Sequence, residues 1–216
     1  MGRKYKLTTL NKSYSYRDSI FYLLKTKKKL AAALNTDLKC LKEQVINPSY
    51  NAFKNGERQI QAPISSLNDL HTRIASLLCR IKQPDYVHSG VKGKSHYTNA
   101  VAHRGSHKLL TMDLKGFFPS TTKRMVFNFF YKKMRCSPDV SELLAQISTY
   151  NGFLPTGSRL SMPLAYWANE RMFNDLNGLA CTESIKMTLF VDDITFSGSK
   201  INEKIIYKLE KNHFQL

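Results

Sequence analysis

The sequence predicts an α+β fold in which a small antiparallel sheet packs with amphipathic helices. Residues 188–198 (TLFVDDITFSG) place two runs of strand-forming residues around Asp192 and Asp193, as expected of a β-hairpin. Residues 53–63 (FKNGERQIQAP) contain Asn55-Gly56, which is a strong hairpin-turn signal. Between the two hairpins, most segments repeat apolar residues at helical spacing.

The chain has 216 residues and a strongly basic composition. Its 33 Lys and Arg residues against 16 Asp and Glu give a formal charge of +17, which attracts polyanions such as nucleic acids. The first residues, MGRKYKLTTLNK, lack the apolar core of a signal peptide. No apolar run approaches the ~20 residues that span a bilayer. We therefore expect a cytoplasmic protein with no membrane partner.

The first half of the chain is predicted to be helical apart from its hairpin. Residues 25–46 carry an apolar stripe and a lysine-rich leading end, which predicts one amphipathic helix. Its lysines either are solvated or contact phosphates. After the hairpin, Ser65 or Ser66 is expected to cap a helix that runs to about residue 81. Residues 87–105 are rich in Gly, His, Lys and Ser, so we expect an irregular loop there.

The second half is predicted to mix strands with helices. Residues 108–121 predict a strand that ends near Asp113 and enters a tight turn. The turn-forming residues NGFLPTGSRLS precede the last of three expected helices. These helices cover 122–135, 139–149 and 160–177. Residues 202–216 (NEKIIYKLEKNHFQL) predict one more helix.

The aspartates at the strand ends indicate a metal site. Asp113 and Asp192 can bring their oxygens to one hard cation if their strands are neighbours. Carboxylates that bridge a pair of magnesium ions ~3.5–4 Å apart stabilise both oxygens of a phosphoryl displacement. A basic chain with carboxylates gathered at one place suits a polymerase or a nuclease. Taken alone, Asp192-Asp193 has a simpler interpretation as a β-turn, where aspartate is common.

Four boxes, in the order 54–63, 113–118, 154–161 and 190–193, make the sequence resemble a reverse transcriptase. FVDD is similar to the aromatic-x-Asp-Asp box, and DLKGFF to the box with the first metal-binding aspartate. LPTGSRLS resembles the Leu-Pro-x-Gly element beneath template and nucleotide, and KNGERQIQAP resembles a fingers segment. Within this family, NAVAH (99–103) and VHSGVKGKS (87–95) resemble the bacterial retron enzymes.

The resemblance covers roughly residues 50–200 and implies a right-hand polymerase. It implies fingers with N-terminal helices over residues 1–107 and a palm with a helix-backed antiparallel sheet over 108–216. In this family a palm strand, a grip element and a helical thumb follow the aspartate hairpin. None of these fits before Leu216. We therefore expect a palm that is incomplete at its C-terminal end and no thumb, as in a truncated product or half of a split enzyme.

The resemblance also implies magnesium-dependent synthesis of DNA on a non-coding RNA. The implied cofactor is Mg²⁺, as two ions. The implied partners are a structured RNA that supplies template and primer, dNTPs, the DNA product (msDNA), and an effector protein or a complementing C-terminal chain. Retron enzymes usually act in anti-phage defence. The alternatives are a non-catalytic RNA-binding remnant and a reverse transcriptase of another defence or intron lineage.

The catalytic residues of the family carry over to matching positions. Asp113, Asp192 and Asp193 would be catalytic and would bind the metal, with the Leu114 carbonyl as a further ligand. Phe118 stands where the family places the aromatic side chain that blocks a ribose 2′-hydroxyl. A buried core phenylalanine is the alternative for this position.

The resemblance assigns two further groups of residues. Arg58, with Lys54, would hold the triphosphate through charge-assisted hydrogen bonds, although a solvated charge is the alternative. Thr156, where many relatives have glutamine, and Gly157 would lie close to the nucleotide, with a simple turn glycine as the alternative. Asn99 and His103 are expected to order their loop or to contact the RNA, and no mechanism is assigned to them.

Overall fold

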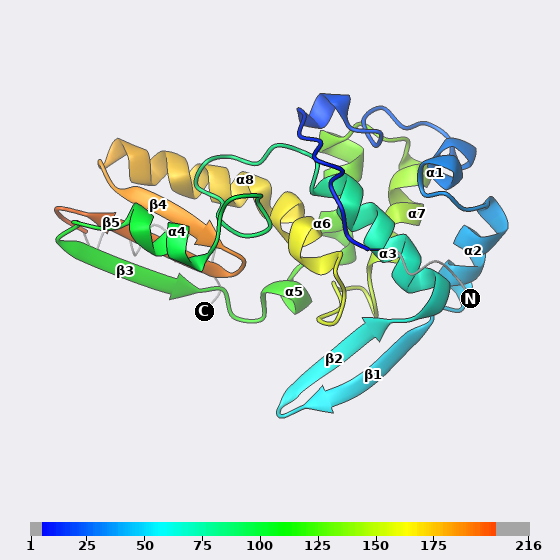
Figure 1. The fold of residues 1–216 in the computed structure, drawn as a ribbon. Helices are drawn as coiled ribbons and strands as arrows, with labels where there is room; N and C mark the ends of the chain where they lie inside the picture. The colour runs from blue at the N-terminus through cyan, green and yellow to red at the C-terminus, as the bar shows by residue number, and fades with distance from the viewer. Residues whose placement is uncertain (1–5, 202–216) are drawn as a thin grey trace. The chain divides into compact units, whose positions relative to one another are not determined.

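The computed structural model describes residues 6–201 and confirms an α+β architecture of antiparallel sheets and packed helices (Figure 1). The chain forms two compact units. Unit 1 comprises Met1–Lys82 and Phe118–Ala168, and unit 2 comprises Gln83–Phe117 and Asn169–Leu216. The predicted fingers and palm divide the chain at residue 107 instead, and this functional division stays a prediction. The helix predicted at 202–216 lies outside the described residues.

Unit 1 consists of short helices packed around a common core. Helices α5 (Phe117–Ser120) and α8 (Ser161–Thr182) belong to both units by sequence. The core of unit 1 contains fully buried side chains such as Leu30, Leu67, Phe130 and Leu144. The remaining helices of unit 1 are η1 (Tyr16–Asp18), α1 (Lys27–Ala33), α2 (Leu38–Ile46), α3 (Ser65–Leu78), α6 (Lys123–Asn128), the π-helix η2 (Phe129–Lys133) and α7 (Pro138–Ser148).

The single helix predicted over residues 25–46 is wrong, because the segment forms α1 and α2. Asn35 adopts a left-handed backbone with φ of 55°, which ends a helix. The Asp37 side chain then accepts a hydrogen bond of 2.7 Å from the Cys40 N–H and caps α2. The predicted serine cap of α3 is also wrong, because Ser65 is already the first helical residue and Ile64 precedes it.

The first hairpin is confirmed. Strands β1 (Tyr50–Asn55) and β2 (Arg58–Pro63) pair in antiparallel register, with Asn55 opposite Arg58. The turn residues are Gly56 and Glu57, one position later than the Asn-Gly signal indicates. Gly56 has φ of 60°, a conformation that glycine adopts without a steric penalty.

Unit 2 is built on a three-stranded antiparallel sheet in the order β3-β5-β4 (Figure 1). Its strands are β3 (Lys108–Asp113), β4 (Lys186–Phe190) and the central β5 (Asp193–Gly198). Because side chains alternate along a strand, each face carries every second residue. One face is apolar and buried, with Met187, Leu189, Ile194 and Phe196. The opposite face is more polar and carries Asp113 and Asp193.

Residues 87–105 are not irregular throughout, as the sequence predicts, because they contain α4 (His96–Ala102). Ser95 and Thr98 form a reciprocal capping box that fixes the start of this helix. At seven residues, α4 is too short for a clear apolar period. A search of residues 6–201 finds no helix that is both long and apolar enough to cross a membrane.

Candidate active site

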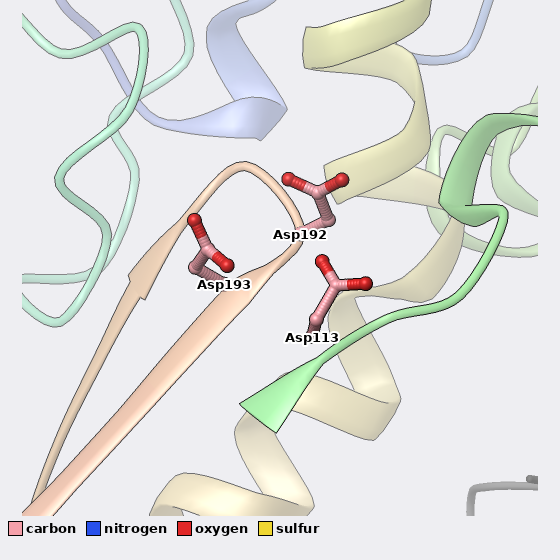
Figure 2. Close-up of side chains that lie close together, drawn as sticks. All are labelled: Asp113, Asp192 and Asp193. Carbon is pink, nitrogen blue, oxygen red and sulfur yellow. The ribbon is translucent and has the colours of Figure 1, made fainter. Parts of the chain in front are cut away.

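Three carboxylates meet at one end of the sheet in unit 2 (Figure 2). Asp113 ends β3, Asp193 begins β5, and Asp192 lies in the turn between β4 and β5. One oxygen from each carboxylate lies within 4.8 Å of an oxygen of the other two. Asp113 pairs with Asp193 in the strand register, and the Leu114 N–H donates to the Asp192 carbonyl at 3.1 Å. Backbone pairing between distant segments therefore brings the three predicted aspartates together.

The donor set of this cluster fits a hard divalent cation. Three negative charges at such a separation repel one another, and a bound cation removes that repulsion. Carboxylate oxygens are the ligands that magnesium prefers, and the side chains of Asp113 and Asp193 are exposed to incoming ions. The Leu114 carbonyl accepts a 3.1 Å hydrogen bond from the Phe117 N–H, and a carbonyl oxygen has a second lone pair.

The turn that carries Asp192 is held from outside the hairpin. Val191 has φ of 59°, which is strained for a β-branched residue. Its N–H donates to the Ser89 hydroxyl at 3.0 Å. Two backbone hydrogen bonds of 2.8 Å join the same upstream segment to β4, from the His88 N–H to the Leu189 carbonyl and from the Leu189 N–H to the Tyr86 carbonyl. These contacts fix a turn that the local sequence disfavours.

Helix α4 is fixed to the polar face of the same sheet through His103. This side chain is only 5% exposed. Its Nδ1 lies 2.6 Å from the Ser197 hydroxyl and its Nε2 lies 2.7 Å from the Thr188 hydroxyl. Burial lowers the pKa of His103, and the nearby Lys186 lowers it further. These contacts support the interpretation that His103 orders its segment. Asn99 is half-buried, and within residues 6–201 its Oδ1 has no hydrogen-bond partner.

The residues predicted to contact the nucleotide are in unit 1. Arg58 and Lys54 are exposed on the β1-β2 hairpin. The Thr156 hydroxyl donates to the Gln59 carbonyl at 2.8 Å, and the Gly157 N–H donates to the Gln61 carbonyl at 3.1 Å. The Leu-Pro-Thr-Gly loop is thus docked on β2.

Phe118 is half-buried at the start of the unit 1 segment that follows the DLKGF box. The roles of Phe118 and of the hairpin and loop residues toward a nucleotide stay predictions.

Replacing Gly157 with alanine is expected to destabilise unit 1 by about 1–3 kcal/mol, because overpacking forces the backbone to shift. A Cβ at Gly157 would lie 2.8 Å from the Gln61 carbonyl oxygen and 2.9 Å from Ile60 Cγ2. Urea unfolding, followed by the fluorescence of the single tryptophan, measures the loss. Gly178→Ala is the control, because nothing lies within 4 Å of that added Cβ. Equal stability of Gly157→Ala and the parent chain would contradict the close packing.

His71 is a buried polar residue of unit 1 that the sequence analysis does not single out. It is fully buried in α3, with Nδ1 2.7 Å from the Ser158 hydroxyl and Nε2 2.8 Å from the Ile147 carbonyl. A carbonyl only accepts, so Nε2 carries the proton and Nδ1 accepts from Ser158. Burial lowers the pKa of His71 to about 4. The only signal in the sequence is its place in the apolar stripe, four residues after Leu67 and three before Ile74.

No protein-family model matches the chain. Curated proteins do match. The retron Se72 reverse transcriptase of Salmonella heidelberg is 32% identical over 165 residues, which cover 72% of this chain and 43% of that protein. The retron Ec86 reverse transcriptase of Escherichia coli is 30% identical over 114 residues, or 53% and 35% of the two chains. The retron Mx162 reverse transcriptase of Myxococcus xanthus is 28% identical over 148 residues, or 60% and 30%. The chain spans less than half the length of these relatives.

Proposed function

We propose that this chain, a relative of the retron reverse transcriptases, provides the catalytic carboxylates for RNA-directed DNA synthesis. The observation that carries the proposal is the meeting of Asp113, Asp192 and Asp193 at one end of a sheet in a basic protein. The proposal retains the division into fingers over 1–107 and an incomplete palm over 108–216 of a right-hand polymerase.

The three aspartates would hold Mg²⁺, with the Leu114 carbonyl as a further ligand. Two such ions stabilise the charge on the attacking and leaving oxygens of a nucleotidyl transfer. The protein itself would orient the substrates. Arg58, with Lys54, would bind the triphosphate. Phe118 would favour deoxynucleotides by crowding a ribose 2′-hydroxyl.

Thr156 and Gly157 would lie next to the nucleotide, and Asn99 and His103 would order the segment beside the sheet or contact RNA. The net charge of +17 supports binding of a structured RNA that serves as template and primer. We extend the proposal to a single-stranded DNA product and to anti-phage defence. An effector protein or a complementing chain would be the further partner.

Primer extension tests the proposal. The 216-residue chain is incubated at low salt with an RNA template, an annealed DNA primer, dNTPs and Mg²⁺. We expect added nucleotides that depend on Mg²⁺ and disappear in Asp192→Asn. Calorimetric titration with Mn²⁺ provides a second measurement that does not require synthesis. Extension that survives chelation of the metal would contradict the proposal. RNA binding without Mn²⁺ binding or extension would indicate the non-catalytic alternative.

A further inference from the structure

A groove of about 620 Å³ lies between α4 and the β3 side of the sheet in unit 2. Leu109 and Thr111 of β3 and Thr195 of β5 line it on one side. Tyr97, Val101 and Arg104 line it from α4 and the residue pair that follows the helix. The lining is therefore largely apolar, with one cationic side chain.

The groove exists because α4 covers only part of the polar face of the sheet. His103 binds the helix to Thr188 of β4 and Ser197 of β5, and both of these residues are buried. Leu109 of β3 is 57% exposed on the same face. An apolar strand residue that stays open to solvent beside a fixed helix indicates a surface that receives another molecule.

The floor of this groove is continuous with the carboxylate cluster. The strand register pairs Leu109 with Ser197, Thr111 with Thr195 and Asp113 with Asp193. Alternate residues of a strand share a face, so these three pairs lie on one surface. Thr111 is two residues from Asp113 and Leu109 is four, or about 7 Å and about 14 Å along the strand.

These separations correspond to a short length of nucleic acid. A stacked strand advances about 3.4 Å per nucleotide along its axis. A strand whose 3′ end lies at the carboxylates would therefore pass Thr111 and Leu109 about two to four nucleotides behind that end.

We propose that this groove binds the DNA strand being extended, two to four nucleotides behind its 3′ end. The inference rests on the proposed function, which makes DNA the product. Tyr97 is 77% exposed and offers a ring on which a base can stack. Leu109 and Val101 offer apolar contact to a deoxyribose. Arg104, which is exposed, offers a charge-assisted hydrogen bond to a phosphate.

Binding of a fluorescein-labelled dT₁₂ oligonucleotide, measured by anisotropy at low salt with Mg²⁺ and no dNTPs, tests the groove. Leu109→Glu places a negative charge in the groove, and Tyr97→Ala removes the ring. We expect either variant to raise the Kd about tenfold, the size of one lost stacking contact. Ile46→Glu is the matched control, because it adds the same charge on α2 at a side chain that is 74% exposed. Its Kd should change less than about twofold.

A photo-crosslink then locates the strand. We expect 4-thiothymidine at the third nucleotide from the 3′ end to crosslink within residues 96–113. The same base at the ninth position should not crosslink there. Equal Kd values for Leu109→Glu, Ile46→Glu and the parent chain would overturn the proposal. So would a crosslink that is independent of position, or tighter Leu109-dependent binding of rU₁₂.

Loss of self-association in Leu109→Glu without oligonucleotide binding by the parent chain would assign the groove to a second copy and also overturn the proposal. These binding measurements need no synthesis, so they are independent of the proposed function. Extension by the parent chain with an unchanged Kd in Leu109→Glu would retain the proposed function and remove the groove. Leu109-dependent binding without any extension would do the reverse.

Discussion

Asp113→Asn is expected to lower the rate of primer extension by about a thousandfold or more. Asparagine keeps the shape of the side chain but removes one of three negative charges whose oxygens lie within 4.8 Å of one another. Metal ions supply several kcal/mol of charge stabilisation in phosphoryl transfer, and about 1.4 kcal/mol corresponds to a tenfold change in rate. Single-turnover extension measures the rate, and calorimetric titration with Mn²⁺ measures the accompanying loss of metal affinity.

Two further variants make this prediction specific. Asp193→Asn is expected to cost less, about tenfold to a hundredfold, because the family resemblance gives this residue a tuning role. Asp175→Asn is the control, because its carboxylate lies 3.8 Å from Arg171 in an exposed pair on α8. An Asp113→Asn chain that extends primers at the parental rate would remove the carboxylate cluster from the mechanism.

Unit 1 is expected to lose about 3 kcal/mol of unfolding free energy through His71 as the pH falls from 6.5 to 4. Burial lowers the pKa of His71 from 6.5 to about 4 in the folded chain. The unfolded chain therefore binds this proton first on acidification. The contribution is complete above pH 6.5 and is lost as the pH falls towards 4. Protonation would also remove the acceptor for the Ser158 hydroxyl.

Urea unfolding at pH 7 and at pH 4.5 measures this effect. Trp167 provides the signal, because it is buried in unit 1 and its ring stacks on Phe129. His71→Gln keeps an N–H donor for the Ile147 carbonyl and has no proton to gain, so its stability should fall less with pH. His107→Gln, at an exposed position, should retain the parental pH dependence. An identical pH dependence in the parent chain and His71→Gln would contradict the assignment.

The sequence predicts those parts of the fold whose determinants are local. Both hairpins follow from strand-forming runs around turn residues, and the aspartates follow from boxes that resemble a known family. The break between α1 and α2 is not predictable from periodicity, because Asn35 interrupts the backbone without interrupting the apolar stripe. Helix α4 escapes for a related reason, since a capping box fixes it within seven residues.

Long-range contacts account for the rest of the difference. That Asp113 reaches Asp192 depends on pairing between β3 and β5, segments about 80 residues apart for which no turn sets the register. His71 acquires its low pKa from neighbours in two distant segments, Ile147 and Ser158. The groove beside Leu109 likewise depends on where His103 anchors α4. In each case the residue was visible in the sequence but its neighbours were not.

The two edges of the unit 2 sheet are not equivalent. The outer edge of β4 is engaged, because Val87 forms a parallel bridge with Leu189. Within residues 6–201, β3 pairs on one side only, with β5. A sheet closed along one edge can grow in one direction only, so an added strand would have to lie beside β3. Whether that strand belongs to the same polypeptide or to another copy decides between completing the domain and concentration-dependent aggregation.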